Sequence, residues 1–168
     1  MIPDPAPAAR VPAVLALGSN LGDRREILRA AVADLAALPR IAVVAASPLL
    51  ETVAVKLDGP DPDAPGYLNG VVLVETDLAP HALLDATAGI EAAHGRVRRE
   101  RWGDRTLDID IIDYDHRTLA DERLVLPHPR AAERAFVLEP WLQVDPEATL
   151  AGAGRVADLV AGIPGGHA

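Results

Sequence analysis

Six apolar segments follow one another in an order that limits the possible folds of this chain. Four segments are short and typical of strands, and two repeat apolar side chains at helical spacing. The strands are expected at residues 11–17, 41–46, 67–75 and 106–113. The helices are expected at residues 24–38 and 80–93, the first with Asp23 as its N-cap. The order is therefore strand, helix, strand, strand, helix, strand.

This order predicts an α+β fold, a ferredoxin-like split βαβ sandwich. Two helices would cover one face of an antiparallel sheet, and the other face would be left for loops and ligand. After the sixth segment, we expect a helical turn at residues 130–134, an edge strand at 136–142 and a short helix at 156–161. Residues 54–66 are rich in Pro, Gly and Asp and predict a long irregular loop, which in compact domains is often functional.

The composition favours one domain over residues 1–168. The chain is 49% apolar and long enough to bury a core, with flexible tails expected at residues 1–10 and 162–168. It lacks the apolar runs of a signal peptide or a membrane-spanning helix. It has no cysteine, which excludes disulfides and thiolate metal sites. We therefore expect a cytoplasmic protein that does not bind membranes.

The charge is unevenly distributed. A net charge of −9 argues against a general nucleic-acid binder. Residues 95–105 nevertheless carry five arginines, namely Arg96, Arg98, Arg99, Arg101 and Arg105. A local group of guanidinium side chains is a candidate anion site. The same run could also be a solvated loop with scattered ion pairs.

Two carboxylates, Asp108 and Asp110, stand two positions apart in the last expected strand. They would share one face of the sheet, while Leu107, Ile109 and Ile111 point toward the helices. Neighbouring carboxylates repel each other unless a cation compensates, and oxygen ligands favour Mg²⁺. Alone, the pair could be solvated on an exposed face. The arginines beside it make a site for Mg²⁺ and a triphosphate the better interpretation.

The phosphate-binding motifs of common nucleotide folds are missing. The chain has no G-x-x-x-x-G-K-[ST], so it is not a P-loop enzyme. Residues 16–24 (ALGSNLGDR) combine a strand, a turn and a helix start without G-x-G-x-x-G. We expect a structural role there, with Gly18 and Gly22 permitting tight turns, in preference to the alternative of phosphate binding.

A flat heterocycle needs stacking and edge hydrogen bonds, and three residues could supply both. Tyr67 opens the third strand, Asn69 follows on the same face, and Phe136 lies after the segment LPHPR. Two aromatic rings and an amide can clamp a heterocycle. Taken singly, each ring would more often belong to the core, and His128, between two prolines, would more often be a surface histidine.

Together these residues resemble the 6-hydroxymethyl-7,8-dihydropterin pyrophosphokinase family of folate biosynthesis. The resemblance is carried by ALGSNLGDR, by Glu51 and Thr52, by YLN at 67–69, by GRVR and RWGDRTLDIDII, and by LPHPR and ERAFVLEPW. It implies the sandwich fold, a monomer, and transfer of diphosphate from ATP to the pterin alcohol with two Mg²⁺ ions. AMP would be the second product.

The resemblance also implies roles by position. Asp108 and Asp110 would hold the metal and act in catalysis together with Arg96 and Arg105. The residues expected to bind ATP are Glu91, Arg98, Trp102, Ile111 (through its backbone), Arg123, His128 and Arg134. The residues expected to bind the pterin are Thr52, Val55, Tyr67, Asn69 and Phe136.

The chain departs from the family pattern after Thr52, where a proline and a short glycine loop are usual, and at Asp104, where a proline is usual. The arginine segment is also one residue shorter. Two alternatives stay open: another Mg²⁺-dependent, ATP-using transferase that acts on a different heterocycle, and a catalytically silent nucleotide-binding regulator. The nucleotide product would separate them.

Overall fold

The computed structural model describes residues 9–52, 54–56, 59–61, 66–94 and 106–163. For residues 54–56 and 59–61 only the backbone is described. Arg96 and Arg105, expected to act in catalysis, and Arg98 and Trp102, expected to bind ATP, therefore lie outside the described residues.

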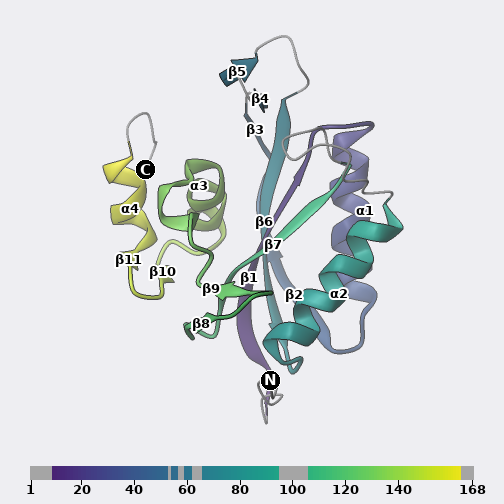
Figure 1. Ribbon diagram of the computed structural model, residues 1–168, viewed down its shortest axis with the longest axis vertical. Helices are drawn as coiled ribbons and strands as arrows, with labels where there is room; N and C mark the ends of the chain where they lie inside the picture. The colour runs from purple at the N-terminus through teal and green to yellow at the C-terminus, as the bar shows by residue number, and fades with distance from the viewer. Residues whose placement is uncertain (1–8, 53, 57–58, 62–65, 95–105, 164–168) are drawn as a thin grey trace.

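A five-stranded antiparallel sheet forms the middle layer of the molecule (Figure 1). Its strands are β1 (Val11–Ser19), β2 (Ile41–Ala46), β3 (Leu50–Thr52), β6 (Tyr67–Thr76) and β7 (Asp108–Tyr114). The order is β2-β6-β1-β7, with β3 also paired to β6. This is the arrangement of a split βαβ sandwich, so the predicted fold class is confirmed.

Helices α1 (Arg24–Ala37) and α2 (Pro80–Ala93) cover one face of the sheet, as predicted (Figure 1). The Asp23 carboxylate accepts a hydrogen bond from the main-chain N–H of Glu26 (3.2 Å) and caps α1. The first hydrophobic core lies between these helices and the sheet. Its buried members include Leu15, Leu17, Leu28, Ala31, Leu35, Leu83, Ile90, Leu107, Ile109 and Ile111.

The edge strand predicted at residues 136–142 is wrong, because this segment belongs to helix α3 (Ala135–Val144). Val137, Leu138 and Trp141 are buried together, which is helical spacing, but a short apolar run does not distinguish helix from strand by itself. With α4 (Val156–Gly162), α3 packs on the second face of the sheet and forms a second core (Figure 1). Only part of that face is therefore left for loops and ligand.

Short strand pairs outside the main sheet complete the described part of the fold. They are β4 (Ala54–Lys56) with β5 (Gly59–Asp61), β8 (Leu119–Ala120) with β9 (Val125–Leu126), and β10 (Thr149–Leu150) with β11 (Gly154–Arg155). The first pair lies in the segment expected to be irregular. The expected helical turn is present as the 3-10 helix η1 (Ala131–Glu133), and the expected last helix is α4. None of the helices in the described ranges is long and apolar enough to cross a membrane.

Candidate active site

Gly18 on β1 lies between the two groups of polar residues predicted from the sequence. It is opposite Asn69 of β6 on one side and Asp108 of β7 on the other. Directly opposite residues share one face of an antiparallel sheet, so Asn69 and Asp108 flank Gly18, each one strand spacing of about 5 Å away. A Cβ atom on Gly18 would come within 3.0 Å of Asn69 Oδ1. The absent side chain keeps the space between the two groups open.

The two motif glycines therefore have different roles. Gly22 has φ of 76° and forms the turn that was predicted. The prediction of a turn at Gly18 is wrong, because Gly18 lies within β1 and its importance is the close approach of Asn69 and Tyr67.

Asp108 and Asp110 are both half-buried on the face of the sheet that they share with Gly18. Ile109 and Ile111 point into the first core, as predicted. In the described ranges, no group of three or more His, Asp or Glu side chains is placed to hold a metal ion. Two carboxylates alone fit Mg²⁺, which commonly keeps water and substrate phosphates as its other ligands.

Two cationic or polar side chains face Asp110 from the segment between β9 and α3. Arg134 Nη1 lies 3.9 Å and His128 Nε2 lies 4.0 Å from Asp110 Oδ2. Burial lowers the pKa of Arg134, and the negative charges of Asp110 and Asp108 oppose that shift. The structure thus brings together four of the residues predicted from the sequence.

The His128 ring is held in one orientation. Its main-chain N–H donates to the carbonyl of Ile112 (2.9 Å), and its Nδ1 accepts from the main-chain N–H of Arg130 (3.2 Å). The hydrogen of the neutral ring is therefore on Nε2, facing Asp110. Burial lowers the pKa of His128; Asp110 opposes this shift, while Arg134 and Arg130 add to it. A neutral ring can donate a hydrogen bond at neutral pH.

A second group of residues lies on the other side of Gly18. Asn69 is 7% exposed, and its Nδ2 donates to Thr52 Oγ1 (3.0 Å). Thr52 pairs with Tyr67 across β3 and β6. Three of the residues expected to bind the pterin therefore form one cluster. The fourth, Val55, lies in β4, where only the backbone is described.

Phe136 lies in the first turn of α3. Its ring is partly buried against the second core, and the guanidinium carbon of Arg134 lies 5.6 Å from the ring centroid. This cation–π contact joins a residue expected to bind the pterin to one expected to bind ATP.

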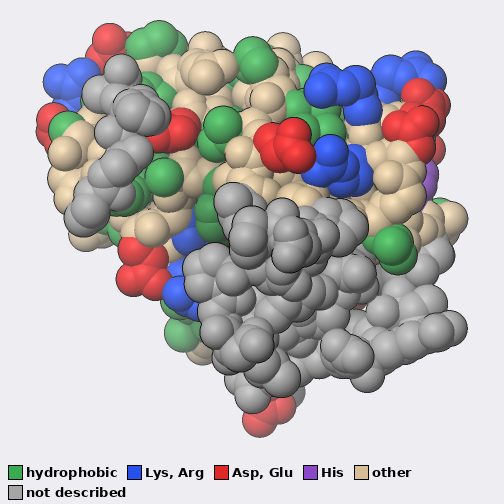
Figure 2. Space-filling model, turned by 90° about the horizontal axis from the view of Figure 1, so that it is seen from above, with side chains coloured by type: hydrophobic (Ala, Val, Ile, Leu, Met, Phe, Trp, Pro, Cys, Tyr) green, Lys and Arg blue, Asp and Glu red, His purple; other side chains and the backbone are tan. Residues whose placement is uncertain are grey.

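In the view of Figure 2, basic and acidic side chains lie beside each other on the described surface.

Glu91 supports β7, the strand that contains Ile111, from inside the molecule. Glu91 is 8% exposed, and its Oε2 accepts a hydrogen bond from the main-chain N–H of Ile109 (2.8 Å). That amide lies between the two aspartates. Ile111 is buried opposite Leu15. Glu91 thus holds the strand that carries the acidic pair, while its direct contact with nucleotide stays a prediction.

Arg123 is placed differently from the other expected ATP-binding residues. Its guanidinium forms an ion pair with Asp85 of α2, and its main-chain N–H donates to Asp121 (2.8 Å). Contact with a nucleotide would require this exposed ion pair to be exchanged. Its role also stays a prediction.

Residues 14–146 match the model of the 7,8-dihydro-6-hydroxymethylpterin-pyrophosphokinase (HPPK) family. The chain belongs to this family. The matched range begins in β1 and ends just after α3, so it includes every site residue described above. HPPK membership confirms the family resemblance of the sequence.

Three bacterial relatives are named 2-amino-4-hydroxy-6-hydroxymethyldihydropteridine pyrophosphokinase. The chain is 46% identical over 140 residues to that of Methylorubrum extorquens, which covers 83% of this chain and 86% of the relative. It is 42% identical over 150 residues to that of Pseudomonas aeruginosa (89% and 90%). It is 43% identical over 143 residues to that of Bacillus subtilis (83% of each).

The fold is also that of a solved HPPK structure. Wild-type HPPK-DHPS of Plasmodium falciparum aligns with a TM-score of 0.67 at 15% identity, covering 89% of this chain and 44% of that one. The chain thus spans less than half of that protein. At this identity the likeness concerns the fold alone.

Sequence reasoning missed a contact of Arg24 with Glu51 and with Gly66, the residue before Tyr67. Arg24 Nη1 donates to the carbonyl of Gly66 (2.6 Å) and to Glu51 Oε1 (3.2 Å). A Cβ on Gly66 would come within 2.4 Å of the Thr52 carbonyl oxygen, so only glycine fits. Arg24 and Glu51 belong to matched motifs, but nothing in either motif reveals that they are partners.

We expect His128 to make the metal-free HPPK domain less stable as the pH falls. The unfolded residue has a pKa of about 6.5. Because the folded ring has a lower pKa, the unfolded chain binds a proton that the folded chain does not, and stability falls as pH decreases through this range. Melting temperatures in EDTA at pH 7.5 and 5.5 should differ less for His128→Gln than for the parent. An equal difference would contradict the assignment.

Proposed function

We propose that this chain transfers diphosphate from ATP to 6-hydroxymethyl-7,8-dihydropterin in folate biosynthesis. The products are the pterin diphosphate and AMP. The register at Gly18 supports the proposal, because Asn69, which is proposed to bind the heterocycle, and Asp108 of the acidic pair lie on either side of Gly18 on one face. A transferase needs this arrangement, in which the acceptor group and the phosphates meet over a small gap.

Asp108 and Asp110 are the residues of this chain that would hold two Mg²⁺ ions. When bound, these ions neutralise charge on the phosphate oxygens. The metal ligands support this assignment. They are two carboxylates on one face of β7, and the missing side chain of Gly18 leaves room beside them for substrate oxygens.

Arg134 and His128 would position the nucleotide. Both side chains face Asp110, and both carry N–H groups that can donate hydrogen bonds to phosphate oxygens. Arg96 and Arg105 are proposed to stabilise the charge that develops on the phosphates. No side chain needs to become phosphorylated, because positioning and charge neutralisation suffice.

In the proposed reaction, the pterin hydroxyl oxygen attacks the β-phosphorus of ATP. The bond from that phosphorus to the α–β bridging oxygen breaks, the hydroxyl proton passes to solvent, and AMP leaves. The choice of the β-phosphorus over the γ-phosphorus comes from the names of the relatives, which are pyrophosphokinases.

We further propose that the chain acts as a single cytoplasmic domain and as a monomer. The common sheet supports a single domain, because the residues of both clusters lie on its strands or on segments packed against it.

The nucleotide product tests the proposal. The protein is incubated with ATP, Mg²⁺ and the pterin alcohol, and the nucleotides are separated. AMP that appears only with the pterin alcohol supports the proposed function, and a pterin without the hydroxymethyl group is the control. ADP would indicate an ordinary kinase. Tight ATP binding without turnover would indicate a regulator.

Tyr67→Ala and Phe136→Ala should each raise the pterin KM about fivefold and leave ATP affinity nearly unchanged, since stacking contributes about 1 kcal/mol beyond burial. Calorimetry with each ligand separates the two effects. Equal losses for ATP and pterin would show that the rings serve the core instead. Because Phe136 is partly packed in the second core, its variant is first checked for an unchanged melting temperature.

A further inference from the structure

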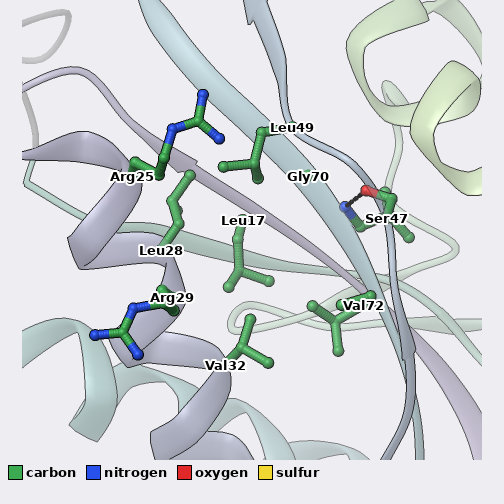
Figure 3. Close-up of a pocket in the computed structure, with 11 residues that line it drawn as sticks. Leu17, Arg25, Leu28, Arg29, Val32, Ser47, Leu49, Gly70 and Val72 are labelled. Carbon is green, nitrogen blue, oxygen red and sulfur yellow. Dashed lines mark hydrogen bonds between the residues drawn. The ribbon is translucent and has the colours of Figure 1, made fainter.

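A cavity of about 410 Å³ lies on the face of the sheet opposite the candidate active site (Figure 3). It opens between α1 and the strands β1 and β6. Its apolar lining includes Leu17, Leu28, Val32, Leu49 and Val72. The volume lies within the range of pockets that hold small ligands.

The path of the chain between β2 and β3 creates this cavity. Ser47 continues the pairing with β6 beyond the end of β2. Its main-chain N–H donates to the Val71 carbonyl (2.8 Å), and its side-chain Oγ, in place of a main-chain carbonyl, accepts from the Val71 N–H (2.9 Å, the dashed line in Figure 3). Leu49 then lies over Gly70, where a Cβ atom would come within 2.9 Å of Leu49 Cδ2. Gly70 thus lets Leu49 rest on the backbone of β6.

The cavity is separate from the candidate active site. Neighbouring residues of a strand point to opposite faces. On β1, Gly18 faces the active site and Leu17 faces the cavity. On β6, Asn69 faces the active site and Gly70 faces the cavity, where it lies opposite Leu17. Among the residues that the structure describes, none of those proposed for catalysis or substrate binding lines the cavity.

One cationic group at the edge of the cavity is available for a ligand. Arg29 already donates twice to Glu26 (2.9 and 2.5 Å), and Figure 3 shows it turned away from the cavity. The guanidinium of Arg25 extends toward Leu49 in the same view. Within the described part of the chain, Arg25 takes part in no hydrogen bond or ion pair, and the cavity is lined by no carboxylate.

We propose that this cavity binds a small amphipathic carboxylate. The apolar side chains cannot satisfy polar groups, so the ligand must be apolar along its body and keep its polar group at the edge. There the planar fork of Arg25 matches a carboxylate. The inference does not depend on the proposed function, because the residues and the face of the sheet are different.

Octanoate is a suitable probe, and its binding to the whole chain can be measured by calorimetry. We expect one saturable site. Arg25→Gln should weaken octanoate binding about three- to fivefold, as the loss of an exposed ion pair does. Arg29→Gln is the matched control on the same helix and should leave the affinity unchanged. The uncharged analogue 1-octanol should bind the parent and Arg25→Gln alike.

The location of the probe is tested by Val32→Phe, which places a larger ring in the cavity and should abolish binding in a protein that still melts cooperatively. If that variant does not fold, the two arginine variants decide. No saturable binding, or equal weakening by Arg25→Gln and Arg29→Gln, would overturn the proposal. Neither measurement needs ATP or turnover, so its failure is distinguishable from failure of the proposed function.

Discussion

Asp108→Ala and Asp110→Ala should each abolish diphosphate transfer while the protein stays folded. Loss of a Mg²⁺ ligand should remove about 4 kcal/mol of transition-state stabilisation, roughly a thousandfold in turnover. The fold should survive, because Asp110 is 48% exposed and its partners Arg134 and His128 lie 3.9 and 4.0 Å away. Contacts of that length at a half-exposed site contribute little to stability.

The measurement is kcat at saturating Mg²⁺ and substrates, with the melting temperature as a check on folding. Asp158→Ala is the matched control, because Asp158 is an exposed carboxylate on α4. Turnover within a few-fold of the parent in either β7 variant would contradict the metal assignment.

Glu91→Leu should lower both stability and turnover. The Glu91 carboxylate accepts the main-chain N–H of Ile109, and both residues are buried. Without an acceptor, that N–H costs about 1–3 kcal/mol, a large part of a total stability of about 5–15 kcal/mol. The strand between Asp108 and Asp110 would also lose its support, so turnover should fall with the melting temperature.

Glu91→Gln separates support of β7 from contact with nucleotide. The amide keeps an acceptor oxygen for Ile109, so stability should recover most of the way toward the parent. Recovery of turnover together with stability would show that Glu91 acts by positioning β7. Recovery of stability alone would favour a direct role toward ATP. An unchanged melting temperature in Glu91→Leu would contradict the account of the hydrogen bond.

The sequence predicted the sheet well because its signals are local. Alternation in β7 placed Asp108 and Asp110 on one face and Ile109 and Ile111 on the other, and the structure has this arrangement. Helix α1 also begins as expected, since Asp23 caps it through Glu26. Both features depend only on side chains a few positions apart.

The errors arose where tertiary contacts decide. The short run at residues 136–142 is equally apolar in either conformation, and only packing against the second face of the sheet makes it α3. Gly18 resembled a turn glycine because its role depends on Asn69, a residue of another strand. The ion pair of Arg123 with Asp85 is likewise invisible in the sequence.

The most direct test of the central claim is phosphorus NMR of the products formed from ATP and 6-hydroxymethyl-7,8-dihydropterin with Mg²⁺. Attack at the β-phosphorus moves the diphosphate as a unit, so the spectrum should show a pterin diphosphate and AMP in equal amounts. A pterin monophosphate with ADP would show attack at the γ-phosphorus and would contradict the account.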